Sequence, residues 1–281
     1  MLHPEDFKKA IKAIEALGAT PAVLVKVSEL ARDANADLSS ICELLRNDGP
    51  LAADIIRISN SPYYAPATPH SNLNSAIHQI GLREVNRVVN FCVSRRIFAR
   101  DLPGYGISAS EYWRASLAAA LVMEAAAKQS GLNQEDAYTI GILHAIGRVL
   151  INQVIDEKGF TIYWTGEQSV QEWERLSVGF DYAQSGAMLL EHWLFPGPTC
   201  DVIRWQLNPE KVDEQKSLLG ALQFTRCLLA DTGSDFERND GKLPETDPFM
   251  RASGLTPAEV VQLVSTCRQE LYRIMETVGV E

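Results

Sequence analysis

The chain has 281 residues, of which 46% are hydrophobic and 22% charged, the composition of a globular protein that buries a core of its own in one large domain or two ordinary ones. Its formal net charge of −10 argues against nucleic acid as the principal partner, because duplex affinity comes mostly from Lys and Arg that neutralise phosphates. The first residues are polar and acidic, and no stretch approaches the roughly 18 uncharged apolar residues of a spanning helix, so we expect a cytoplasmic protein without membrane contact.

The five cysteines do not form a metal or redox motif. No two of them are spaced as CxxC, the pattern of zinc knuckles and of thioredoxin-type redox sites. Most have apolar neighbours, so we expect small buried side chains in a reducing compartment, and we expect no cofactor. The five are Cys42, Cys92, Cys200, Cys227 and Cys267.

Proline, glycine and capping residues divide the chain into helices. Pro4 suits the first turn of a helix that Gly18 ends, and three prolines between residues 61 and 69 require a loop. Apolar residues between 85 and 92 recur at steps of three and four, and no long stretch alternates β-branched with polar residues, so the predicted fold class is all-α. Helices are expected at about 4–18, 21–32, 38–47, 50–60, 72–81, 83–100, 108–130, 133–156, 170–176, 181–194, 199–206, 213–230 and 257–278, with an exposed connection at 231–247.

Three segments follow one another in the order that is typical of one protein family. Asp48–Leu51 and Ile55–Ser61 resemble the pattern D-P-x-L followed by L-L-R-L-A-N-S, with the proline displaced by one position. Ser75–Gly81 resembles A-I-x-x-L-G, and Gly141–Arg148, which reads GILHAIGR, resembles G-L-L-H-D-I-G-R/K. On these segments the chain is similar to the HDOD domain, an output module of bacterial signal transduction and a degenerate relative of the HD metal phosphohydrolases.

This resemblance implies a multi-helix HD-like bundle. An HDOD-like helical domain is expected at residues 1–206, with an N-terminal lobe at about 1–107 and an HD-like lobe at about 108–206. Residues 207–281 are then a C-terminal helical extension packed on that domain.

The catalytic relatives need a metal site that this chain does not reproduce. One imidazole does not outcompete water for a divalent ion, so three or four His and Asp side chains must converge. The resemblance places Ala145 at the Asp of the His-Asp doublet, and Ala115 and Ala183 at positions where His is common. A His pair is frequent where this chain has Arg204-Trp205-Gln206, so of the family's usual ligands only His144 survives. The other histidines lie at positions that the family does not use for ligands: His3, His70, His78 and His192.

From these departures we expect no catalytic residue and no bound metal. His144 is predicted to be a packed side chain whose imidazole donates to a backbone carbonyl or to another side chain. Gly141 and Gly147 lie inside a predicted helix, where each costs roughly 1 kcal/mol relative to Ala. Close approach of a neighbouring helix, the alanine-rich stretch 115–127, is the expected compensation.

One surface is a candidate for binding a partner or a ligand. Tyr63 and Tyr64 follow Asn60 and Ser61 in the proline loop, and Tyr covers a large contact area at little entropic cost. The alternative is that Asn60 ends its helix and the two rings cover the edge of the domain. Arg83 and Arg87 of the following long helix complete the candidate surface. For these arginines, however, we expect solvated or ion-paired side chains rather than an anion site.

Three functions remain open on the sequence. The resemblance favours a non-catalytic regulatory or scaffold protein that contacts other signalling proteins, or further copies of itself. A divergent metal-dependent phosphohydrolase acting on nucleotides or cyclic dinucleotides is the alternative from another class. The third is a sensor that binds a small ligand between the lobes without turning it over.

Overall fold

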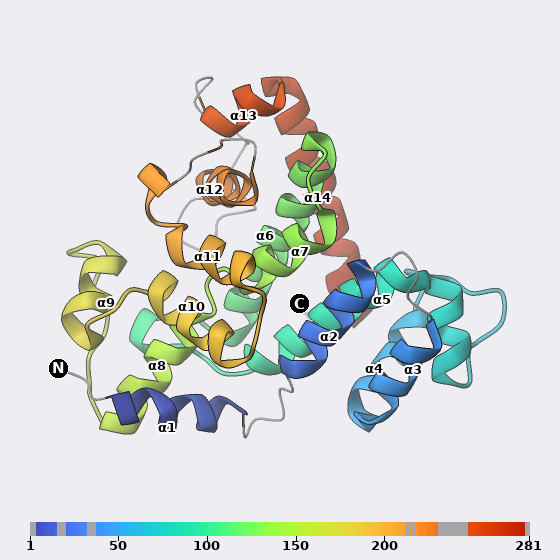
Figure 1. The fold of residues 1–281 in the computed structure, drawn as a ribbon, viewed down its shortest axis with the longest axis horizontal. Helices are drawn as coiled ribbons and strands as arrows, with labels where there is room; N and C mark the ends of the chain where they lie inside the picture. Colours follow the sequence, from blue (N-terminus) through green and yellow to red (C-terminus); the bar gives the residue numbers. More distant parts are fainter. Residues whose placement is uncertain are drawn as a thin grey trace.

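The structure, a computed structural model, describes residues 4–15, 21–32, 38–211, 214, 217–229 and 247–278. It is all-α, as predicted, and its described residues contain no β-strand beyond an isolated bridge between Leu102 and Ile107 (Figure 1). The helices are α1 (Pro4–Glu15), α2 (Pro21–Arg32), α3 (Leu38–Arg46), α4 (Gly49–Ser59), α5 (Leu73–Ile97), η1 (Pro103–Tyr105), α6 (Ala109–Ser130), α7 (Gln134–Leu143), α8 (Gly147–Lys158), α9 (Val170–Val178), α10 (Tyr182–His192), α11 (Gly197–Trp205), η2 (Pro209–Lys211), α12 (Leu218–Leu229), α13 (Pro248–Ser253) and α14 (Pro257–Val278).

Local chemistry sets most of the helix ends where the sequence predicts them. The side chain of Asp48 accepts a hydrogen bond from the Leu51 amide at 2.9 Å and so caps α4. Ser108 and Glu111 form a capping box at the start of α6, and Gly131, in the left-handed region at φ 69°, ends that helix. Gly18 and nearly all of the predicted connection at 231–247 lie outside the described residues.

Gly81 kinks α5 between the two helices that were predicted at 72–81 and 83–100. Gly81 has φ 79° and ψ 164°, which are not helical angles, so the element consists of a short segment and a long one joined at a kink. The predicted division at residues 81–83 is therefore confirmed.

The single helix predicted at 133–156 is wrong, because a turn at residues 144–146 separates α7 from α8. The amides of Arg148 and Val149 bond three residues back, to Ala145 and Ile146, at 2.9 and 3.1 Å. The carbonyl of His144 instead accepts from Gln206 Nε2 at 2.7 Å, and the carbonyl of Ala145 accepts from the Tyr112 hydroxyl. Tertiary hydrogen bonds thus replace the bonds of a continuous helix.

The two glycines of this region explain why the chain turns. A Cβ at Gly141 would lie 2.6 Å from Cα of Ala120 on α6, so the predicted close approach of the alanine-rich helix is confirmed there. A Cβ at Gly147 would lie 1.9 Å from the carbonyl oxygen of Tyr182 and 2.5 Å from the amide nitrogen of Gly186, both on α10. For Gly147 the expected neighbour was therefore wrong, since α7 packs on α6 and α8 packs on α10.

The pair α6 and α7 forms the centre of the molecule (Figure 1). α12 and α14 pack on α6, while α2 and the long α5 pack on each other and both reach α7. In Figure 1, α3 and α4 lie at one end of the molecule and α9 at the other. α1 lies against α8, where Lys158 pairs with Asp6 at 2.7 Å, so the first helix of the expected N-terminal lobe packs on the HD-like lobe.

One stretch of the described chain, residues 134–158, is long and apolar enough to cross a membrane by length and composition. However, 83% of its apolar window is buried inside the protein, and the turn at 144–146 interrupts it. Burial of this kind is typical of the core helices of a water-soluble protein.

Four of the five cysteines are buried as small apolar side chains. Cys227 on α12 is the exposed one. Burial is the main cause that raises the pKa of the Cys92 and Cys267 thiols to about 12, so both remain protonated at neutral pH.

Candidate functional site

A pocket of about 550 Å³, a volume that includes space open to solvent, contains His144 and Ala145, the residues that resemble the His-Asp doublet of the HD relatives. Its walls come from α6, from the turn between α7 and α8, from the starts of α8 and α10, and from α12. We call it the HD pocket, and it is lined by Ile107, Tyr112, Ala115, Ser116, Ala119, His144, Ala145, Arg148, Tyr182, Thr225, Arg226 and Leu229.

His144 is half-buried at the edge of this pocket, and its imidazole is used within the chain. Nδ1 lies 2.7 Å from the carbonyl oxygen of Gly141, and a carbonyl accepts hydrogen bonds only, so Nδ1–H is the donor. The prediction of a packed histidine that donates to a backbone carbonyl is confirmed.

The residues of the HD pocket do not fit a catalytic divalent metal. Ala115 and Ala145 bring methyl groups to the wall, and within the described part of the chain no three His, Cys, Asp or Glu side chains converge as ligands. Arg148 and Arg226 also line the pocket, and their positive charges oppose a cation.

Arg148 is a buried charged residue in the wall of this pocket, and the sequence analysis did not single it out. Arg148 is only 7% exposed. Its guanidinium lies 4.5 Å from the centre of the Tyr182 ring and 5.7 Å from the centre of the Tyr105 ring, within the range of cation–π contacts. Its Nε is buried without a hydrogen-bond partner among the described residues. A signal was available, because Arg148 is the single charged residue between Ala137 and Ile155.

Although burial opposes the shift, the carboxylate of Glu174 on α9 helps to raise the pKa of the Arg148 guanidinium. It is fully buried and accepts two hydrogen bonds of 2.8 Å, from the Tyr105 hydroxyl and from the Tyr182 amide. Burial raises the pKa of this carboxyl to about 7, although Arg148 opposes the shift. At neutral pH a large fraction of molecules therefore carries no charge at Glu174.

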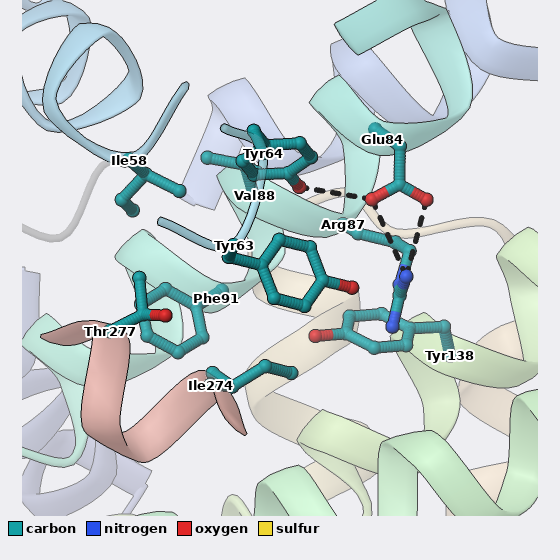
Figure 2. Close-up of a pocket in the computed structure, with 10 residues that line it drawn as sticks. All are labelled: Ile58, Tyr63, Tyr64, Glu84, Arg87, Val88, Phe91, Tyr138, Ile274 and Thr277. Atoms are coloured by element: carbon teal, nitrogen blue, oxygen red, sulfur yellow. Dashed lines mark hydrogen bonds and ion pairs between the residues drawn. The ribbon is translucent and has the colours of Figure 1, made fainter. Parts of the chain in front are cut away.

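A second pocket, of about 400 Å³, contains part of the predicted partner surface (Figure 2). We call it the tyrosine pocket, and it lies among the α4–α5 connection, α5, α7 and α14. Its lining residues are Ile58, Tyr63, Tyr64, Glu84, Arg87, Val88, Phe91, Tyr138, Ile274 and Thr277.

The two predicted tyrosines point into this pocket and are held by the chain itself. Their rings meet edge to face with centres 4.7 Å apart. The Tyr64 hydroxyl donates to Glu84 at 3.0 Å, as Figure 2 shows, and the Tyr63 hydroxyl donates to Glu270 of α14. Their role in binding a partner stays a prediction.

Arg87 joins the elements around the tyrosine pocket. It pairs with Glu84 at 3.2 Å, with Glu124 of α6 at 3.4 Å and with Glu270 of α14 at 3.6 Å. Arg83 lies outside the lining and pairs with Glu124 at 3.1 Å. The ion-paired reading of these two arginines is confirmed.

The other two predicted residues lie beside the tyrosine pocket and do not line it. The Asn60 side chain bonds both the amide and the carbonyl of His70, at 2.6 and 2.9 Å, and so closes the proline loop. Ser61 is buried next to it. The contribution of α14 was missed, because nothing in the sequence indicates which helix covers the loop.

The helical bundle around the His144 turn defines a protein of the HD-like all-α class. Within that class, the chain belongs to the HDOD domain family, whose model matches residues 17–209. α12 and α14 follow the matched segment, although α12 supplies a wall of the HD pocket.

One curated relative is an uncharacterized protein of Treponema pallidum (strain Nichols), 22% identical over 217 residues that cover 74% of this chain and 41% of the relative. The chain thus spans less than half of that relative's length. A solved structure from Marinobacter aquaeolei VT8, provisionally named a signal transduction protein, matches with a TM-score of 0.72 and 20% identity over 98% of this chain and 64% of that one.

A second solved structure, an HDOD domain protein with unknown function from Geobacter sulfurreducens, matches with a TM-score of 0.66 and 20% identity over 89% of each chain. At these identities the two structures establish the common fold alone.

Proposed function

We propose that this chain is a non-catalytic regulatory or scaffold protein of bacterial signal transduction, which acts in the cytoplasm through contacts with other proteins. One observation carries the non-catalytic part. The HD position holds His144 beside Ala145, its imidazole is bonded to Gly141 within the chain, and Arg148 brings positive charge where a metal would lie.

The regulatory part of the proposal is supported by membership of the HDOD family and by the name given to the Marinobacter aquaeolei protein. The α4–α5 connection is our candidate for the surface that contacts the partner. Pro62 is exposed there, and Tyr63 and Tyr64 behind it are fixed by bonds to Glu270 and Glu84, so the loop is held in one conformation. A rigid loop loses little entropy on binding.

Photo-crosslinking in the native bacterium tests this proposal. A photoreactive amino acid replaces Pro62, and the matched control carries it at Tyr163, which is 57% exposed on the α8–α9 connection. We expect a defined protein, or a second copy of the chain, to crosslink from position 62 and not from position 163. Equal products from both positions, or none from position 62, would contradict a contact through this loop.

A further inference from the structure

The HD pocket carries positive charge in an acidic protein. Arg148 and Arg226 line it, no Asp or Glu is among its lining residues, and the whole chain has a net charge of −10. Charges at the wall of a partly enclosed cavity act more strongly than charges in open water. The pocket therefore attracts anions, although the net charge of the chain is negative.

Two buried hydrogen-bonding atoms in the wall have no partner among the described residues. One is Nε of Arg148, which lies at the start of α8 and is only 7% exposed. The other is the hydroxyl of Thr225 on α12, a residue with 0% exposure. Buried polar atoms are nearly always bonded, so two of them in one cavity wall indicate a ligand that supplies acceptors.

We propose that the HD pocket binds the phosphate group of a small molecule, held by Arg148 and Arg226 and by the hydroxyl of Thr225. Guanidinium groups bind phosphate through charge-assisted hydrogen bonds. The donors come from two helices, α8 and α12. The pocket is partly open to solvent, so the rest of the small molecule can extend out of it.

The site would connect the HDOD core with the C-terminal helices. Thr225 and Arg226 follow the family's matched segment, which ends at residue 209. Arg226 Nη1 donates to the carbonyl of Gln206 at 2.7 Å, and Gln206 Nε2 donates to the carbonyl of His144 at 2.7 Å. A bound phosphate group adds a second bridge between α12 and α8, beside this chain of hydrogen bonds. This inference stands apart from the proposed function, because it does not depend on a protein partner.

Isothermal titration calorimetry with inorganic phosphate tests the site, in chloride buffer of constant ionic strength with EDTA present. We expect saturable binding with one site per chain. Replacing Arg226 by Gln should weaken it about tenfold, the loss expected for one charge-assisted contact. Arg204→Gln is the matched control, because Arg204 pairs with Glu191 outside the pocket, and its affinity should stay unchanged.

Thr225→Val separates binding from folding. The valine removes a buried hydroxyl that has no partner, so the melting temperature without phosphate should not fall, while phosphate affinity should drop about threefold or more. Phosphate also stabilises proteins by exclusion from their surfaces, but that effect is the same in every variant.

A second titration with AMP distinguishes a phosphate ester, which should bind more tightly than phosphate, from the free ion.

Absence of saturable phosphate binding would overturn the proposal. So would equal affinity in wild type, Arg226→Gln and Thr225→Val. Binding that is seen in a titration without EDTA and is lost when EDTA is present would also overturn it, because a metal ion would then join the phosphate to the chain. The photo-crosslinking result is unaffected by any of these outcomes, so the two proposals fail separately.

Discussion

At the scale of single residues, the HD position shows what one substitution does to its neighbours. With Ala145 at the place that the HD pattern gives to an aspartate, His144 bonds through Nδ1 to the carbonyl of Gly141. That outcome was predictable, because the ligand pattern can be read from the sequence. The buried pair Arg148 and Glu174 was not, since their proximity depends on how α9 packs against α8.

Glu174 makes a prediction about pH at this scale. Burial raises the pKa of its carboxyl from an ordinary 4.5 to about 7, so between these values the native state keeps a proton that the unfolded chain has released. The stabilisation is complete below pH 4.5 and is lost as pH rises to about 7. The free energy of unfolding should fall by about 3 kcal/mol across this window, at about 1.4 kcal/mol per pH unit.

Urea denaturation of wild type and Glu174→Gln at pH 5, 6, 7 and 8 measures this contribution. The amide does not titrate, so the difference in unfolding free energy between the two proteins should change with pH up to about 7 and then level off. A difference that stays constant from pH 5 to pH 8 would show that the carboxyl is charged throughout.

At the scale of elements, the glycines at 141 and 147 decide how α7 and α8 are directed. Periodicity alone predicts one helix there, because both segments are apolar and each turn residue tolerates helical angles. The break depends on side chains far away in the sequence. Gln206 bonds the carbonyl of His144, and the Tyr112 hydroxyl bonds the carbonyl of Ala145 in addition to the Arg148 amide. Such contacts appear only once the chain has folded.

Gly147→Ala should destabilise the protein by about 3 kcal/mol or more, because its Cβ would meet backbone atoms of α10 that move only with the whole helix. Gly104→Ala is the matched control, since its Cβ would stand 3.4 Å from Asn152 Oδ1, an ordinary contact, and should change stability by about 1 kcal/mol or less. Melting temperatures by circular dichroism compare the two. Equal shifts would mean that the approach of α8 to α10 is not tight.

At the scale of the whole molecule, the sequence predicts the fold class and most helix ends, because caps, prolines and glycines act locally. It does not predict that α1 packs on α8. It predicts that residues 207–281 pack on the domain, but not that α12 and α14 do so on α6. Those arrangements place Thr225 in the HD pocket and Glu270 at the tyrosine pocket. The walls of both pockets therefore depend on helices that follow the family's matched segment.

The content of transition metals in the purified protein shows whether His144 and Ala145 mark a metal site. The protein is expressed with added manganese, iron and zinc and is measured by inductively coupled plasma mass spectrometry beside His144→Ala. We predict far less than one metal ion per chain in both proteins, and no hydrolysis of bis(p-nitrophenyl) phosphate that depends on His144. One or two metal ions per chain in the wild type, lost in His144→Ala together with turnover, would contradict the account.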